Sequence, residues 1–141
     1  MRGNGNESLD FRTGMADSLM QEIARLLAAL AQTGEPSAID LRSLPMTATD
    51  RAELEERLGQ GDIAAALVVA GRSEVWETRY SGVWWVRHFG ADEKIAAERI
   101  EITQVPEILL THADDIAAAS ARLHADLVTM MGSARESAEH V

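Results

Sequence analysis

The sequence contains no cysteine. This absence excludes disulfide frameworks, thiol catalysis, iron–sulfur clusters and zinc sites with cysteine ligands, and it is compatible with a reducing cytoplasm. The four histidines, at positions 88, 112, 124 and 140, form no HExxH motif and no pair on one helix turn. We therefore expect neither a metal site nor a cofactor.

Motifs of catalysis are missing as well. The chain has no nucleophile elbow, no dinucleotide-binding GxGxxG and no phosphate-binding GxxxxGK[ST]. Neighbouring carboxylates such as Glu55 with Glu56, and Asp114 with Asp115, fall on the polar sides of predicted helices, where solvation explains them. We expect a protein that is not an enzyme.

Basic residues are scarce and long apolar runs are absent. The 13 basic and 23 acidic residues give a net charge of −10, which repels nucleic acid and anionic membrane surfaces. The longest apolar segment, residues 19–31, contains Gln21, Glu22 and Arg25 and is too short to cross a bilayer. We expect a cytoplasmic protein that binds neither nucleic acid nor membrane.

With 141 residues, the chain has the usual size of one domain. We expect a flexible leader over residues 1–14, a single domain over 15–132 and a flexible tail over 133–141.

Three segments show the apolar spacing of amphipathic helices. The first begins at Asp17 or Ser18 and ends at Gly34; the second begins at Thr47 or Thr49 and ends at Gly59; the last begins at Thr111 or Asp114 and ends before Gly132. Their apolar stripes consist of Met15, Leu19, Ile23, Leu26, Leu27 and Leu30, then Leu54 and Leu58, then Ile116, Leu123, Leu127 and Met130. A short extended piece covers residues 39–45.

Between residues 62 and 103 the apolar period changes to two, which predicts strands near 63–70, 74–80, 83–89 and 94–103. A two-residue turn at Ser81-Gly82 pairs Tyr80 with Val83. The expected fold class is α+β: an antiparallel four-stranded meander packed on one face by two N-terminal helices and one C-terminal helix.

Counting outward from that turn assigns each side chain to one face of the sheet. The expected core face contains Ile63, Leu67, Val69, Trp76, Tyr80, Val83, Trp85, Phe89, Ile100 and Ile102. The expected second face contains Val68, Val75, Trp84, Val86, Ile95 and Ala97 among the polar residues Glu77, Arg79, His88, Arg99 and Glu101.

Aromatic residues are few, and five of the six fall within residues 76–89. Trp76 and Trp85 are expected in the core. Trp84 is expected on the second face beside Arg79 and Arg99, whose guanidinium groups can lie over an exposed indole. Either a partner contact or a cover within the chain explains Trp84 there. The hypothetical partner site has Trp84, Arg79 and Arg99 as its centre and Glu77, His88 and Glu101 as its polar rim.

Several segments, in chain order, resemble one known family. They are 39–45 (IDLRSLP), 71–75 (GRSEV) followed by Glu77-Thr78, 82–86 (GVWWV) followed by His88, 100–102 (IEI) and 105–109 (VPEIL). Together they are similar to the C-terminal region of the hydrogenase expression/formation proteins labelled HupH, HyaF or HoxQ. The motif residues that carry the resemblance are Asp40, Arg42, Pro45, Gly71, Ser73, Glu74, Gly82, Trp85 and Pro106.

The resemblance implies an accessory protein, a chaperone or scaffold, in the expression, maturation or assembly of [NiFe] uptake hydrogenase. Its partner would be a hydrogenase structural subunit before assembly or another hydrogenase accessory protein. Family members are longer than this chain, so a shortened member can have a narrower role.

Two other classes of function remain open. The first is a small enzyme or ligand-binding domain with a pocket between sheet and helices, lined by Trp76, Tyr80 and Trp85 with His88 or Glu101 within reach. The second is a homodimer that covers the mixed second face of the sheet.

Overall fold

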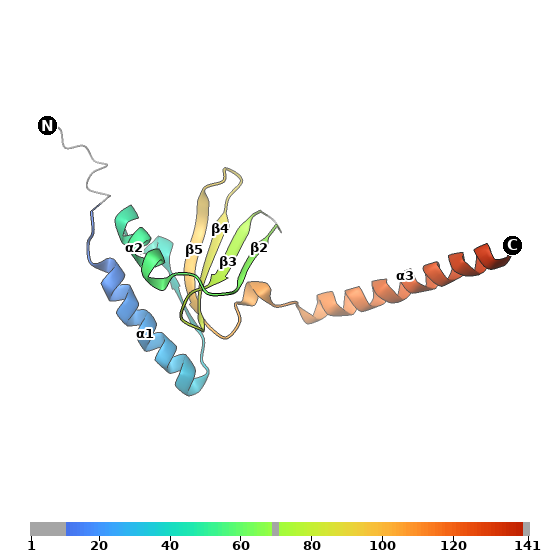
Figure 1. The fold of residues 1–141 in the computed structure, drawn as a ribbon, viewed down its shortest axis with the longest axis horizontal. Coiled ribbons are helices and arrows are strands. Elements are labelled where there is room, and N and C mark those ends of the chain that lie inside the picture. Colours follow the sequence, from blue (N-terminus) through green and yellow to red (C-terminus); the bar gives the residue numbers. More distant parts are fainter. Residues whose placement is uncertain (1–10, 69–70, 140–141) are drawn as a thin grey trace. The chain divides into compact units, whose positions relative to one another are not determined.

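The computed structural model describes residues 11–68 and 71–139, and it confirms the α+β class. One antiparallel sheet has the strand order β1-β5-β4-β3-β2, and α1 and α2 lie to one side of it (Figure 1). The helices are α1 (Met15–Thr33), α2 (Ala48–Leu58) and α3 (Ala113–Glu139). The strands are β1 (Ser37–Asp40), β2 (Ala64–Leu67), β3 (Ser73–Glu77), β4 (Val83–Phe89) and β5 (Ile95–Ile102), and single 3-10 turns lie at Leu41–Ser43 (η2) and Glu107–Leu109 (η3).

The ends of the first two helices follow the local sequence. Gly34 ends α1 in the left-handed conformation and donates its backbone N–H to Leu30 O. Thr47 caps α2 as predicted, in a capping box with Asp50. The predicted side-chain cap of α1 at Asp17 or Ser18 is wrong, because the cap position is Gly14, which has no side chain to donate or accept.

The sheet has a fifth strand that the sequence analysis did not place. β1 overlaps the segment 39–45, expected only to be extended, at Ile39 and Asp40, and it pairs with β5 so that Ile39 lies opposite Ile100. β1 occupies one edge of the sheet and the alanine-rich β2 occupies the other. The four-stranded count was therefore one strand too low, because nothing in a local pattern tells which distant strand an extended segment will join.

The register of the β3–β4 hairpin differs from the prediction by two residues. Trp76 lies opposite Trp85 and not opposite Arg87, so the turn has four residues, 79–82. Val83 donates its backbone N–H to Tyr80 O, and Gly82 takes a φ of 92°, which favours glycine. Because a shift of two residues preserves the alternation of side chains, the predicted faces are correct for β3 and for β4 up to His88.

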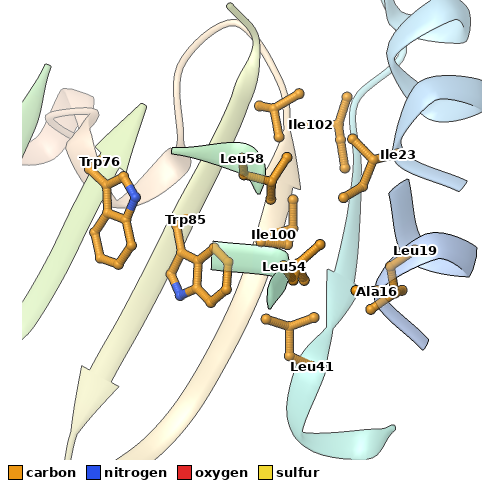
Figure 2. Close-up of a cluster of buried hydrophobic side chains, with 11 residues drawn as sticks. Ala16, Leu19, Ile23, Leu41, Leu54, Leu58, Trp76, Trp85, Ile100 and Ile102 are labelled. Atoms are coloured by element: carbon orange, nitrogen blue, oxygen red, sulfur yellow. The ribbon is translucent and has the colours of Figure 1, made fainter. Parts of the chain in front are cut away.

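The core lies between α1, α2 and one face of the sheet (Figure 2). Trp85 has no exposed surface, and Ile100 of the neighbouring strand has none either. The buried side chains of this core are Ala16, Leu19, Ile23, Leu41, Leu54, Leu58, Trp76, Val83, Trp85, Ile100 and Ile102. Five of them, Trp76, Val83, Trp85, Ile100 and Ile102, are residues that the face count assigned to the core.

Four other assignments to the core face are wrong. Leu67 pairs with Ser73 and therefore shares the face of Val75, because the β2–β3 register was counted incorrectly. Ile63 and Tyr80 are 49% and 43% exposed, since they lie just outside the strands. Phe89 follows a β-bulge at the end of β4 and lies under the guanidinium of Arg72, outside the core cluster. Val69 lies outside the described residues.

The last helix continues past its predicted end. α3 runs through Gly132 to Glu139, so residues 133–139 of the predicted tail are helical. A glycine inside a helix costs only about 1 kcal/mol, and the alanines and charged residues that follow it favour helix. The chain divides into two compact units, residues 1–106 and 107–141, so the expected packing of this helix on the sheet stays a prediction. Within the described residues, no helix is long and apolar enough to span a membrane.

Candidate functional site

A buried carboxylate on the helix-covered face of the sheet is the centre of a charged cluster. Glu98 of β5 accepts a hydrogen bond from the indole Nε1 of Trp85 at 2.7 Å and another from Nε of Arg87 at 2.7 Å. Its second oxygen pairs with Arg51 of α2. We call Glu98, Arg51, Arg87, Trp85 and Trp76 the Glu98 cluster.

Two tryptophans form the aromatic side of the Glu98 cluster. The rings of Trp76 and Trp85 are stacked, with centroids 5.6 Å apart and planes 5° apart. The guanidinium of Arg87 lies 5.1 Å from the centroid of the Trp76 ring. These contacts satisfy a carboxylate that has almost no exposed surface, so the Glu98 cluster joins β4, β5 and α2.

Glu98 is not among the predicted site residues, although the sequence contains the signal for it. Glu98 has the same parity as Ile100 and Ile102, and Arg87 has the same parity as Val83 and Trp85. Two opposite charges on the predicted core face are therefore expected to be paired with each other, because an isolated buried charge is strongly unfavourable.

Beside the Glu98 cluster, a hollow opens between α2 and the β2–β3 edge of the sheet. Its volume is about 400 Å³, and it is lined by Glu55, Gln60, Ala64, Ala65, Ala66, Glu74, Val75, Trp76 and Arg87. The small alanine side chains of β2 leave this space unfilled. The indole Nε1 of Trp76 is buried and has no hydrogen-bond partner among the described residues. The predicted pocket residues are thus separated, because Trp76 lines this hollow whereas Tyr80 lines another, apolar one of about 250 Å³ with Met20, Ile23 and Leu27.

The predicted centre of the partner site is not an exposed platform. Trp84 is only 4% exposed, and its Nε1 donates a hydrogen bond to Thr103 O at 3.1 Å. The prediction that Trp84 lies open on the second face is therefore wrong. Its neighbours Val75 and Val86 on that face are buried too, so the middle of the second face is not a solvated surface.

The two arginines expected beside Trp84 do not flank it as a pair. Arg79 lies in the turn after β3, and its guanidinium packs so closely on Gly59 that a Cβ there would come within 2.7 Å of its Nε. Arg99 stays on the second face, where its Nε donates to Glu101 at 2.8 Å. The prediction placed Arg79 on the strand because it assumed a shorter turn.

The polar rim is partly assembled. Glu77, Arg99 and Glu101 lie on the second face, and His88 joins them at the other end of β4. Nδ1 of His88 lies 2.7 Å from Oγ of Ser73. Glu101 is buried except for 7% of its surface, whereas the Arg99 side chain is 49% exposed. Arg99 is thus the most exposed residue of this group.

A second buried carboxylate fixes the segment before α1. Asp50 accepts hydrogen bonds from the backbone N–H of Thr13 at 2.8 Å, from the Thr13 hydroxyl, and from the backbone N–H of Thr47 at 3.2 Å. Burial by itself raises the pKa of Asp50, but the hydrogen bonds from Thr13 and Thr47 outweigh it and leave the pKa below its ordinary value of 3.8. Residues 11–14 of the predicted leader are therefore held against α2, and residues 1–10 lie outside the described residues.

The motif residues of the resemblance occupy structural positions. Asp40 caps the turn η2 by accepting from the backbone N–H of Arg42 at 3.0 Å. Gly71 and Gly82 have φ values of 120° and 92° in turns, which explains glycine at both positions. Ser73 is hydrogen-bonded to His88, and Trp85 donates to Glu98. Glu74 forms an ion pair with Arg72. Pro45 follows η2, and Pro106 is buried.

Across residues 11–68 and 71–139, no three histidine or acidic side chains are grouped so that they could hold a metal ion. The buried carboxylates Glu98 and Asp50 are both occupied by donors of the fold. The geometry of the described residues offers contact surfaces and a hollow.

Comparisons with known proteins identify what this domain resembles. Residues 14–130 match the model of the family described as "HupH hydrogenase expression protein, C-terminal conserved region". The hydrogenase expression/formation protein HoxQ of Azotobacter vinelandii is 30% identical over 88 residues, which cover 62% of this chain and 31% of that protein. The hydrogenase-1 operon protein HyaF of Escherichia coli K12 is 29% identical over 89 residues, which cover 63% of this chain and 31% of that protein.

A solved structure agrees with the sequence matches. The hydrogenase expression protein HupH from Thiobacillus denitrificans ATCC 25259 superposes with a TM-score of 0.81 at 39% identity, covering 84% of this chain and 99% of that one. The chain spans about a third of the length of the curated relatives it matches.

Proposed function

Because the chain belongs to the family of the HupH C-terminal conserved region, we propose that it is a non-catalytic accessory protein in the expression and maturation of [NiFe] uptake hydrogenase. It acts as a chaperone or scaffold in the cytoplasm. Its partner is a hydrogenase structural subunit before assembly or another hydrogenase accessory protein.

One observation carries this proposal: the match extends over nearly the whole domain, in sequence and in three dimensions. The relatives are named for the expression and formation of hydrogenase. The chemistry of the fold supports a role in binding, since its buried carboxylates Glu98 and Asp50 serve to join elements.

We place the partner contact around Arg99 on the second face of the sheet. Arg99 is half exposed and is paired with Glu101, while Glu77 and His88 lie on the same face. Trp84 lies on the same face but is not available for direct contact with a partner, because its indole is buried and donates a hydrogen bond to Thr103 O. Exposed charges of this kind chiefly tune the rate and the salt dependence of association.

Affinity capture with the tagged chain, from cells that produce hydrogenase, tests the role. Mass spectrometry of the captured proteins should show a hydrogenase subunit or hydrogenase accessory protein. Capture without any hydrogenase-related protein would contradict the proposed function.

A pair of arginine variants tests the surface. Arg99→Glu should weaken capture, whereas Arg25→Glu on α1 should not. Arg25 is a matched control, because both arginine side chains are exposed and each has one acidic partner. Equal capture by wild type and Arg99→Glu would place the contact elsewhere on the domain.

The hollow beside Trp76 favours a second candidate, a small ligand-binding domain. Its volume of about 400 Å³ falls in the range of ligand pockets, and Trp76 Nε1 is an unused donor in its wall. Ala66→Leu would fill the hollow from β2. A metabolite that changes the tryptophan fluorescence of wild type but not of Ala66→Leu would support this candidate, and no response to any tested metabolite would count against it.

A further inference from the structure

The outer edge of β2 has backbone groups that no described strand pairs. β2 is the last strand of the sheet, and β3 is its one neighbour within residues 11–68 and 71–139 (Figure 1). Glu77 of β3 donates its backbone N–H to Ile63 O. Because the paired groups alternate along an antiparallel strand, Ala64 and Ala66 direct their backbone N–H and C=O groups away from β3.

The second compact unit of the chain does not supply a strand for this edge. Its described residues, 107–139, form η3 and α3 and contain no strand. The backbone groups inside a helix bond to one another and are not available to a sheet. This conclusion depends only on the secondary structure of that unit.

β2 also lacks the features that commonly protect the edge of a sheet. Edge strands usually contain charged side chains, proline or a bulge, which prevent pairing with another chain. β2 has the sequence AAAL and a regular register with β3. The strand at the opposite edge, β1, contains Asp40 and follows Pro36. The edge of β2 is therefore the one suited to accept a further strand.

The hollow beside Trp76 adjoins this edge. On the helix-covered face Ala64 lies opposite Trp76 and Ala66 lies opposite Glu74, so only the two alanine methyl groups separate the edge from the hollow. Trp76 is 5% exposed, and its Nε1 has no hydrogen-bond partner among the described residues. A buried N–H without an acceptor is unfavourable, so an occupant of the hollow that provides an acceptor is stabilised there.

The charges of the hollow indicate which acceptor fits. Glu55 and Glu74 lie 3.5 and 3.7 Å from Arg87, whose Nε already donates to Glu98. An acidic side chain would meet two carboxylates and an arginine that is already paired, and a basic side chain would give Trp76 Nε1 no acceptor. An amide satisfies both needs, because its oxygen accepts from the indole and its NH2 group donates to a carboxylate.

We infer that the edge of β2 binds an extended peptide segment of a partner protein as a sixth strand, with an asparagine or glutamine side chain of that peptide in the hollow. The backbone of Ala64 and Ala66 supplies affinity and the amide supplies specificity, as in other cases of strand addition. Because side chains alternate along a strand, the two neighbours of the amide lie on the second face beside Leu67, where apolar residues fit.

This contact goes beyond the proposed hydrogenase role. It uses none of the residues around Arg99, and its test uses no hydrogenase protein, so that the two proposals can fail separately.

Selection of random heptapeptides displayed on phage, with the full chain as the target, tests the site. The selected peptides should share an asparagine or glutamine between apolar residues. Synthetic copies should bind Ala66→Pro at least roughly tenfold more weakly than wild type, because a backbone hydrogen bond is lost and the proline ring obstructs the edge. Proline at position 66 removes an N–H that points away from β3 and takes no hydrogen bond from the β2–β3 ladder.

Ala38→Pro is the matched control on the opposite edge. Thr103 donates its backbone N–H to Gly82 O, so the odd-numbered residues of β5 pair with β4, and Ala38, opposite Glu101, directs its N–H away from the sheet. The selected peptides should bind this variant as they bind wild type. A selection that enriches no peptide, or peptides that bind Ala66→Pro as tightly as wild type, would overturn the inference.

The place of the amide is tested in the peptide itself. Replacement of the shared asparagine or glutamine by leucine should weaken binding to wild type roughly tenfold, because Trp76 Nε1 loses its acceptor. Equal binding of the amide and leucine peptides would contradict the position of the amide in the hollow.

Amide hydrogen exchange of wild type separates strand addition from other binding at the hollow and needs no variant. A saturating peptide should slow the exchange of the Ala64 and Ala66 N–H groups at least roughly tenfold, since both then donate to the peptide backbone. A small molecule that occupies the hollow would leave their exchange unchanged. Peptide binding without protection of these two N–H groups would overturn strand addition.

Discussion

The carboxylate of Glu98 accepts the indole N–H of Trp85 at 2.7 Å, and neither side chain is appreciably exposed. The same carboxylate also pairs with Arg87 and Arg51, which come from β4 and α2. One acidic residue on the core face therefore satisfies an indole and two guanidinium groups where α2 crosses the sheet.

Replacement of Glu98 by glutamine should lower the free energy of unfolding by about 3–5 kcal/mol, because it leaves the partly buried guanidinium groups of Arg51 and Arg87 without their shared anion. Urea denaturation measures this loss. Glu22→Gln, which breaks an exposed ion pair with Arg25, is the control and should cost about 1 kcal/mol or less. A cost of Glu98→Gln as small as that of the control would show that the Glu98 cluster does not stabilise the fold.

Both adjacent tryptophans of β4 should be important for stability. Trp85→Ala and Trp84→Ala should each cost about 3–5 kcal/mol, since both side chains are buried, one on each face of the sheet. Denaturation of the two variants under identical conditions tests this. A loss for Trp84→Ala of less than half that for Trp85→Ala would support the exposed position that the sequence suggested.

The stability of the protein should fall at acidic pH in part through Asp50. Its pKa is depressed in the folded state, so the ionised carboxylate stabilises the fold above its ordinary pKa of 3.8, and this contribution is lost as the pH falls below that value. Thermal melts of wild type and Asp50→Asn across the acidic range measure the effect. The variant should be less stable at neutral pH, and the difference should shrink as the pH falls through this range. A difference that does not depend on pH would contradict the role of the charge.

Two glycines should respond to alanine with opposite signs. At Gly61 a Cβ would lie 2.7 Å from the backbone oxygen of Thr78, so Gly61→Ala should cost about 1–3 kcal/mol. At Gly132, inside α3, a Cβ would meet nothing within 4 Å, and Gly132→Ala should stabilise the helix by about 1 kcal/mol. Chemical denaturation tests the first change, and circular dichroism during heating tests the second. Similar effects of the two substitutions would contradict the close approach at Gly61.

The sequence by itself determined the presence of the three helices, four of the five strands and most of the core. Apolar spacing located α1 and α2, the glycine after α1 and the threonine before α2 fixed their ends, and the alternation of side chains separated Trp85 from Trp84. These features depend on residues near one another in the chain, which a local pattern contains. The resemblance to the hydrogenase expression family was also visible in the sequence. Its motif residues include Gly71 and Gly82, which have positive φ values, and Trp85, which lies in the core.

Only the tertiary structure decided which of these residues are exposed and which charges meet. The burial of Trp84, the position of Arg79 against Gly59 and the pairing of β1 with β5 depend on segments far apart in the sequence. The partners of Glu98 come from positions 51, 85 and 87, and the parity of β5 predicts that Glu98 is buried without telling which cations reach it. Long-range packing determines such contacts, because every local conformation is compatible with several of them.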